Sequence, residues 1–79
     1  MNVGVVFEYD DTMFDVAIVN QRGHDSCTVN DGAEVFDSGN DTIPLVLGPN
    51  YFIDTVADVC AAGMKMAINA TPPPPSIKI

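Results

Sequence analysis

Short alternations of apolar and polar residues divide most of this chain into candidate strands. Valine, isoleucine, phenylalanine and tyrosine are concentrated in segments bounded by glycine, asparagine, aspartate and proline, which is the pattern of strands separated by turns. The segments predicted as strands are 3–9, 15–19, 33–36, 42–47, 51–53 and 64–69. No window of about 11 residues shows a convincing helical stripe, so segments 20–25 and 48–50 are interpreted as turns. Many short strands with frequent turns predict an all-β sandwich or barrel.

Proline marks two places in this pattern. Pro44 cannot donate a hydrogen bond to a neighbouring strand, so the strand that contains it is expected at an edge or a bulge. After Asn69 the composition changes to four consecutive prolines between Thr71 and Ser76. This run favours an extended polyproline linker over an SH3-type ligand. We therefore expect one folded domain over residues 1–70 and a Pro-rich tail over residues 71–79.

Composition and charge narrow the classes of partner. Eleven acidic against three basic residues give the 79-residue chain a formal charge of -8, which repels nucleic acid and anionic lipid headgroups. No apolar run approaches the roughly 18 residues of a membrane span, so membrane insertion by this chain is not expected. A domain this short has a marginal core without a covalent or metal staple. Cys27 and Cys60 could supply one.

Several separated segments resemble phytocyanins, a plant blue-copper family, in the same order along the chain. They are VVFEY from residue 5, DVAIV from residue 15, DSC from residue 25, FDSGNDTI from residue 36, YFI from residue 51 and CAAGMK from residue 60. The resemblance covers residues 2–70 and includes plantacyanin-like and early nodulin-like features. It implies a cupredoxin-like Greek-key β-sandwich. That sandwich is expected to be incomplete at the N-terminus, because no signal peptide and no opening strands are visible.

The same resemblance locates the copper-binding positions of the family. Blue copper requires two imidazoles, one thiolate and a weak axial ligand. By this likeness the two imidazole positions hold Phe14 and Val59, and the thiolate position holds Asp54. Only Met64 is retained, in the axial position. A lone thioether holds copper weakly and a carboxylate is a poor substitute for a thiolate, so we expect three vacated ligand positions, no cofactor and no metal.

Cysteines and asparagines are candidates for covalent modification. In the family both cysteines are structural partners, so the resemblance implies a Cys27–Cys60 disulfide rather than two free thiols. The segments Asn40-Asp41-Thr42 and Asn69-Ala70-Thr71 both fit the acceptor pattern for N-glycosylation. Pro72 directly after Thr71 disfavours the second site. Asn40, at a predicted turn, is the favoured candidate.

The remaining titratable residues carry weaker signals. By the resemblance, Asp15, Asp54 and Asp58 lie near the vacated site, where they could bind a hard cation such as calcium. Their spacing matches no calcium loop, so we favour solvated surface charge. Asp54 could be enclosed by its neighbours or could turn outward. His24, the single imidazole, is expected in a solvated loop, without the further ligands of a zinc site or the partner of a nucleophile–base pair.

These observations favour a protein that is not an enzyme. The leading hypothesis is a copper-free, extracellular binding or structural module of the early nodulin-like type, at the outer face of the plasma membrane or in the wall of a plant cell. Its partner, a glycan or a protein, is not identified by the sequence. One alternative is blue-copper electron transfer, as in the family. Another is a truncated fragment without function.

Overall fold

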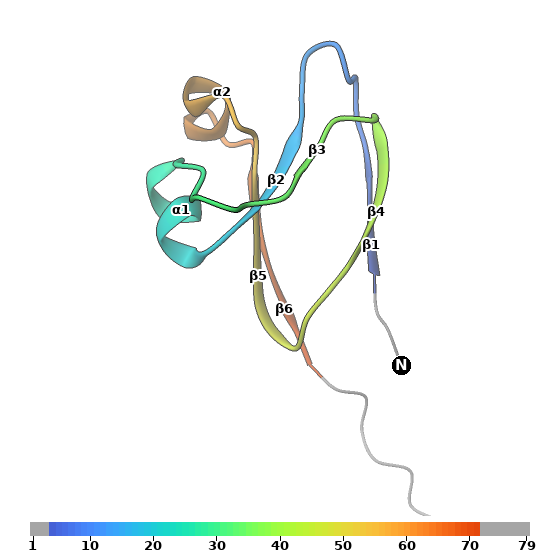
Figure 1. Ribbon diagram of the computed structural model, residues 1–79, viewed down its shortest axis with the longest axis vertical. Helices are drawn as coiled ribbons and strands as arrows, with labels where there is room; N and C mark the ends of the chain where they lie inside the picture. Colours follow the sequence, from blue (N-terminus) through green and yellow to red (C-terminus); the bar gives the residue numbers. More distant parts are fainter. Residues whose placement is uncertain (1–3, 72–79) are drawn as a thin grey trace, which may run out of the picture.

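Two antiparallel sheets form the protein, which a computed structural model describes over residues 4–71 (Figure 1). One sheet pairs β1 with β4, and the other has the strand order β3-β2-β5-β6. The elements in chain order are β1 (Gly4–Glu8), β2 (Val16–Val19), α1 (Gln21–Ser26), β3 (Val35–Phe36), β4 (Asn40–Pro44), β5 (Gly48–Ile53), α2 (Ala57–Ala61) and β6 (Lys65–Ala70). The expected all-β sandwich is confirmed, with two short helices added to it.

Alternation along the strands builds the contact between the two sheets. In β1, Val5 and Phe7 turn inward while Val6 and Glu8 are exposed. The Phe7 ring meets the Phe52 ring of β5 at a centroid distance of 5.0 Å and a tilted angle. Tilted aromatic pairs of this kind add to the stabilisation from burial. The inner cluster has Val16, Ile43 and Phe52 at its centre and joins strands of both sheets.

The opposite face of the larger sheet is buried under the helices. Ala17, Val19 and Ile53 pack there against Cys60 of α2, and Cys27 follows α1 beside them. Both faces of β2 and β5 are therefore covered, which explains why β2 reads as a continuous apolar run instead of an alternating one. Figure 1 shows both helices on the side of this sheet that faces away from β1 and β4.

The helix α1 replaces the turn predicted over residues 20–25. Asn20 caps it, because its side-chain oxygen accepts a hydrogen bond from the Gly23 amide at 2.8 Å. Cys27 ends it in the left-handed conformation, at φ 53°. Gly23 is buried where a side chain would collide, since a Cβ there would lie 2.6 Å from the Thr28 carbonyl oxygen. A six-residue helix is too short to show a 3.6-residue stripe, and tertiary packing holds it.

The boundaries of two strands also differ from the prediction. β5 begins at Gly48, so the turn predicted at 48–50 is wrong, and these residues pair with the end of β6. The buried Asn50 explains the change. Its amide accepts from the Val46 nitrogen at 3.0 Å and donates to the Val46 and Gly48 carbonyls at 2.9 Å. This side chain closes the preceding turn from inside the strand.

The expectation for Pro44 is confirmed. It ends β4, and within the described residues β4 pairs with β1 alone, which makes it an edge strand. None of the helices in the range 4–71 is long and apolar enough to cross a membrane. The last strand ends at Ala70. The Pro-rich tail predicted at 71–79 lies, from residue 72 onward, outside the described part, so the division into domain and tail stays a prediction.

Candidate functional site

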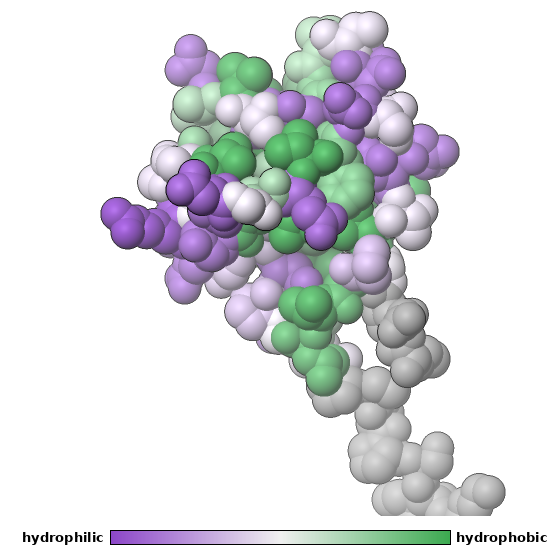
Figure 2. Space-filling view, viewed as in Figure 1, coloured by the Kyte–Doolittle hydropathy of each residue, from purple (hydrophilic) through white to green (hydrophobic). Residues whose placement is uncertain are grey.

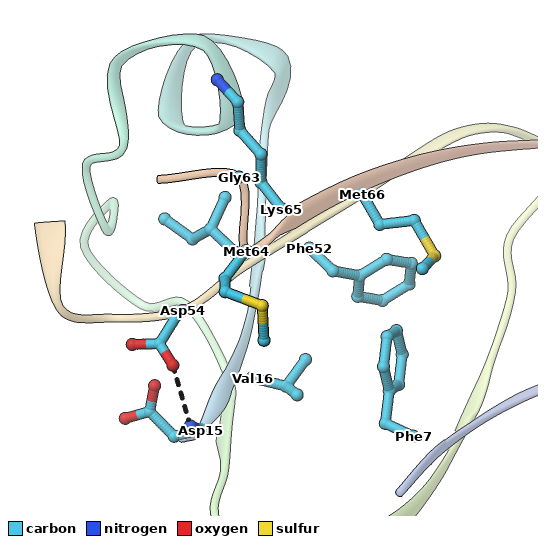
Figure 3. Close-up of a pocket in the computed structure, with 10 residues that line it drawn as sticks. Phe7, Asp15, Val16, Phe52, Asp54, Gly63, Met64, Lys65 and Met66 are labelled. Carbon is cyan, nitrogen blue, oxygen red and sulfur yellow. Dashed lines mark hydrogen bonds between the residues drawn. The ribbon is translucent and has the colours of Figure 1, made fainter. Parts of the chain in front are cut away.

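Two aspartates join the start of β2 to the end of β5 at one end of the sandwich. The Asp54 carboxylate accepts a hydrogen bond from the Val56 amide at 2.8 Å and one from the Asp15 amide at 3.2 Å. In return the Asp15 carboxylate accepts from the Thr55 amide at 2.8 Å and from the Thr55 hydroxyl. Figure 3 shows the two carboxylates side by side. We call this reciprocal arrangement of Asp15 and Asp54 the carboxylate clamp.

Asp54 is buried, with 2% of its surface exposed. Of the two orientations left open by the sequence, the enclosed one is therefore observed. A buried carboxylate is tolerated when backbone amides satisfy its oxygens, and here each oxygen of Asp54 accepts one such bond. Its role in the structure is to hold the backbone that follows β5.

An apolar pocket of about 180 Å³ lies beside the clamp, between β1 and β6 (Figure 3). Phe7 reaches it from β1 and Met66 from β6, with Phe52 and Val16 at its base. Its full lining is Phe7, Asp15, Val16, Phe52, Ile53, Asp54, Gly63, Met64, Lys65 and Met66. Met64 and Met66 are each 45% exposed, so the pocket opens to solvent past two thioethers.

The structure brings together only some of the predicted ligand positions. Asp54 and Met64 both line the pocket, and the Asp54 amide donates to the Met64 carbonyl at 3.0 Å. Phe14 lies instead in a neighbouring depression that shares Asp54. Val59 lies on α2 outside the lining of both, and its carbonyl accepts from the Met64 amide at 3.3 Å. The assignment of these four residues to ligand positions stays a prediction.

The other metal candidates are dispersed. Asp58 is exposed on α2, while Asp15 and Asp54 are committed to the clamp. Over residues 4–71 no group of three or more His, Cys, Asp or Glu side chains is close enough to hold a metal ion.

His24 lies on α1 and not in the solvated loop expected from the sequence. Its ring packs against the Tyr51 ring at a centroid distance of 5.3 Å, and its Nδ1 lies 3.0 Å from an Asp25 carboxylate oxygen. The Lys65 ammonium group donates to the His24 carbonyl at 3.3 Å. These contacts fix α1 against β5 and β6. The imidazole is a packing residue and is not part of the pocket lining.

A second acidic network braces the loops around β1 and β4. The Ser38 hydroxyl donates to Asp41 at 2.6 Å, and the Tyr9 hydroxyl donates to Asp41 and lies 3.0 Å from the Phe36 carbonyl. Hydrogen bonds from Ser38 and then from Tyr9 hold the pKa of Asp41 below its usual range. Desolvation raises the pKa of Tyr9 above its ordinary value, and the bond to Asp41 raises it further. Both shifts favour neutral Tyr9 beside ionised Asp41.

The predicted disulfide is present. Cys27 and Cys60 are joined across a Cα separation of 5.7 Å and a sequence separation of 33 residues. The pocket residues Phe7 and Met66 were missed by the sequence analysis as parts of a site. The alternation in β1 indicated that Phe7 faces inward, but nothing local in the sequence indicated that β6 lies opposite it.

Several known proteins are similar to this chain. The basic blue protein of Cucumis sativus is 42% identical over 66 residues, which span 84% of this chain and 69% of that protein. Early nodulin-like protein 22 of Arabidopsis thaliana is 44% identical over 68 residues, 85% of this chain. The match spans about half of that relative's length, 49%.

Solved structures show the same likeness. Spinach plantacyanin superposes with a TM-score of 0.83 at 44% identity, over 86% of this chain and 75% of that one. A cucumber basic protein described as a blue copper protein superposes with a TM-score of 0.82 at 42% identity, over 85% of this chain and 70% of that one. The cupredoxin-like fold implied by the sequence resemblance is thereby confirmed.

These relatives correct the prediction of a protein without a cofactor. That prediction is wrong, because one structural neighbour is a blue copper protein, a relative is named a basic blue protein, and copper is the cofactor that the family implies. The donors found at the pocket do not match the usual blue-copper set of two imidazoles and a thiolate. The clamp offers carboxylate oxygens, Met64 offers a thioether, and both cysteines are joined to each other.

The family assignment rests on a match that spans most of the chain. Residues 2–64 match the model of a plastocyanin-like domain. The retained disulfide and the relatives described above agree with this match. On this evidence the chain belongs to the phytocyanin family of plastocyanin-like domains.

Proposed function

We propose that the protein acts at the plant cell surface or wall by binding and not by catalysis, and that the pocket between β1 and β6 receives an apolar side chain of a protein partner. The observation that carries this proposal is the apolar lining of the pocket, with Phe7, Phe52 and Met66 around an opening to solvent. Apolar cavities with a few polar groups at the rim are the usual form of a binding site. The disulfide supports an oxidising compartment such as the cell exterior.

The lining favours a protein partner over a glycan. Sugar recognition requires hydrogen-bonding groups directed at hydroxyls, whereas the Asp15 and Asp54 oxygens are occupied by backbone amides and the Thr55 hydroxyl. Methionine side chains are polarisable and adapt their shape to apolar groups. Met64 and Met66, both half-exposed at the rim, suit contact with an aliphatic or aromatic side chain.

The surface around the pocket supports a docking role. Large hydrophobic side chains are exposed near it at several points, among them Met13, Val56, Met64 and Met66. Figure 2 shows hydrophobic patches between hydrophilic ones on the face seen in Figure 1. The formal charge of -8 favours a partner with a basic rim around its apolar anchor.

Electron transfer through copper is the second candidate. The names of the basic blue protein and of the blue copper protein with the same fold favour it. On this reading the pocket would receive a redox partner and the chain would hold a copper ion.

A binding experiment tests the docking role of the pocket. The labelled full chain is titrated onto plant protoplasts, with Met66→Lys as the pocket variant and Val35→Lys as its control. Val35 is similarly exposed but lies on β3 outside the pocket, so both variants change the charge equally. We expect saturable binding that falls about tenfold in Met66→Lys, is unchanged in Val35→Lys and is lost when surface proteins are digested.

Equal binding of the chain and the Met66→Lys variant, or binding that survives digestion of the surface proteins, would overturn the binding proposal. Copper is then added to the purified chain. One tightly bound ion with an intense visible charge-transfer band would support electron transfer as a function of the same chain.

A further inference from the structure

The acceptor sequence that begins at Asn40 opens the edge strand β4. Because successive strand residues point to opposite faces, Asn40 and Thr42 share the outer face of the smaller sheet, while Asp41 and Ile43 turn inward. Asp41 is held there by Tyr9 and Ser38, and Ile43 is buried. The asparagine and the hydroxyl that the acceptor pattern requires therefore lie on the same solvent-exposed face.

The side-chain amide of Asn40 is available for attachment of a sugar. Its backbone is engaged, since the Asn40 amide donates to the Ser38 hydroxyl at 3.2 Å and the Asn40 carbonyl oxygen lies 3.1 Å from that hydroxyl. Within residues 4–71 its side-chain amide makes no hydrogen bond. Replacing an amide hydrogen by a sugar therefore breaks no contact of the fold.

The surroundings of Asn40 leave room for a bulky group. Across the sheet its neighbour is Glu8, and the neighbour of Thr42 is Val6, which is 55% exposed. The pocket proposed for the partner is reached from Phe7, on the opposite face of β1. A glycan on the outer face would extend over Val6 and leave the pocket open.

The disulfide supplies an independent indication of compartment. Cys27–Cys60 is a bond of the oxidising secretory pathway, and N-linked glycans are attached to acceptor asparagines of secreted proteins. We infer that Asn40 is the attachment site of an N-linked glycan that projects from the outer face of the β1–β4 sheet.

The second acceptor sequence is an internal comparison. Asn69 is also exposed, near the end of β6. Pro72 follows Thr71 directly and restricts Thr71 to extended backbone, whereas Ile43 follows Thr42 and imposes no such restriction. The glycan is therefore assigned to Asn40 and not to Asn69.

The test uses the full chain secreted from plant cells behind a cleavable leader. Intact mass is measured before and after treatment with peptide N-glycosidase, and the released site is mapped by the conversion of asparagine to aspartate. We expect complete loss of the glycan mass in Asn40→Gln and in Thr42→Ala, and retention in Thr42→Ser and in Asn69→Gln. Peptide mapping of the unmutated chain decides the matter even where a variant fails to fold.

Two results would overturn the assignment. One is an unglycosylated chain secreted from cells that glycosylate a control protein. The other is glycan that persists in Asn40→Gln or that maps to Asn69.

Discussion

Reduction of the Cys27–Cys60 disulfide should remove a large part of the stability of the domain. The bond closes a loop with a sequence separation of 33 residues, for which the loop-entropy model gives about 4 kcal/mol. A 79-residue chain has a total free energy of unfolding of roughly 4–12 kcal/mol. The bond also fixes Cys60, which is fully buried against Ala17, Val19 and Ile53. We therefore expect reduction to remove between about a third and all of the free energy of unfolding.

Urea unfolding followed by circular dichroism measures this effect directly. The oxidised chain is compared with the same chain in excess reductant, and Cys27→Ala/Cys60→Ala serves as the matched control. That double variant should be about as unstable as the reduced chain and should not respond to reductant. A loss of less than about 1 kcal/mol on reduction would refute the loop-closure argument, because the helices would then be held by packing alone.

Three further predictions concern single side chains. Gly23→Ala should destabilise the protein by about 1–3 kcal/mol, because the added Cβ would lie 2.6 Å from a backbone oxygen. The control Gly4→Ala should be nearly neutral, because the nearest atom to its Cβ would lie at 3.5 Å. Equal urea midpoints for the two variants would contradict the steric argument. Asp54→Ala should lower the free energy of unfolding by about 1–3 kcal/mol for each backbone amide left without an acceptor. The amide hydrogens of Asp15 and Val56 should then exchange faster with solvent. Unchanged protection of both amides would exclude the clamp. Tyr9→Phe should destabilise most between about pH 4 and pH 10, the ordinary pKa values of the two groups. Folding lowers the pKa of Asp41, so the stabilisation by the Tyr9–Asp41 hydrogen bond is lost as the pH falls through the pKa of Asp41 in the folded protein. Folding raises the pKa of Tyr9, so the same stabilisation is lost as the pH rises through the pKa of Tyr9 in the folded protein. A difference between Tyr9→Phe and the parent chain that does not vary with pH would refute the coupling.

The strands were predictable because their signal is local. The alternation in β1 and the apolar run of β2 indicate strands before the pairing of the strands is known. The helices were missed because six and five residues make too few turns to show a period. One local signal was available, since Asn20 three residues before Gly23 is a capping arrangement. That cap alone could not be distinguished from a turn, because asparagine is favoured in both.

The pocket depends on pairings that no local pattern contains. Phe7 and Met66 lie 59 residues apart in sequence, and both line the pocket because β1 and β6 belong to two different sheets that pack together. The resemblance drew attention to Asp54 and Met64, which both line the pocket, and it treated Asp54 as an emptied ligand position. The structure gives that carboxylate a positive role.

The role of Asp54 follows from the backbone around it. At the end of β5 the chain turns toward α2, so the amides of Val56 and Asp15 face a buried space and need acceptors. A carboxylate supplies two acceptor oxygens, and a thiolate supplies one weak acceptor. In this chain the residue at this position satisfies two backbone amides. The Asp54 carboxylate thereby holds the backbone at the end of β5. The pocket that Asp54 and Met64 line depends on the clamp for the position of this backbone.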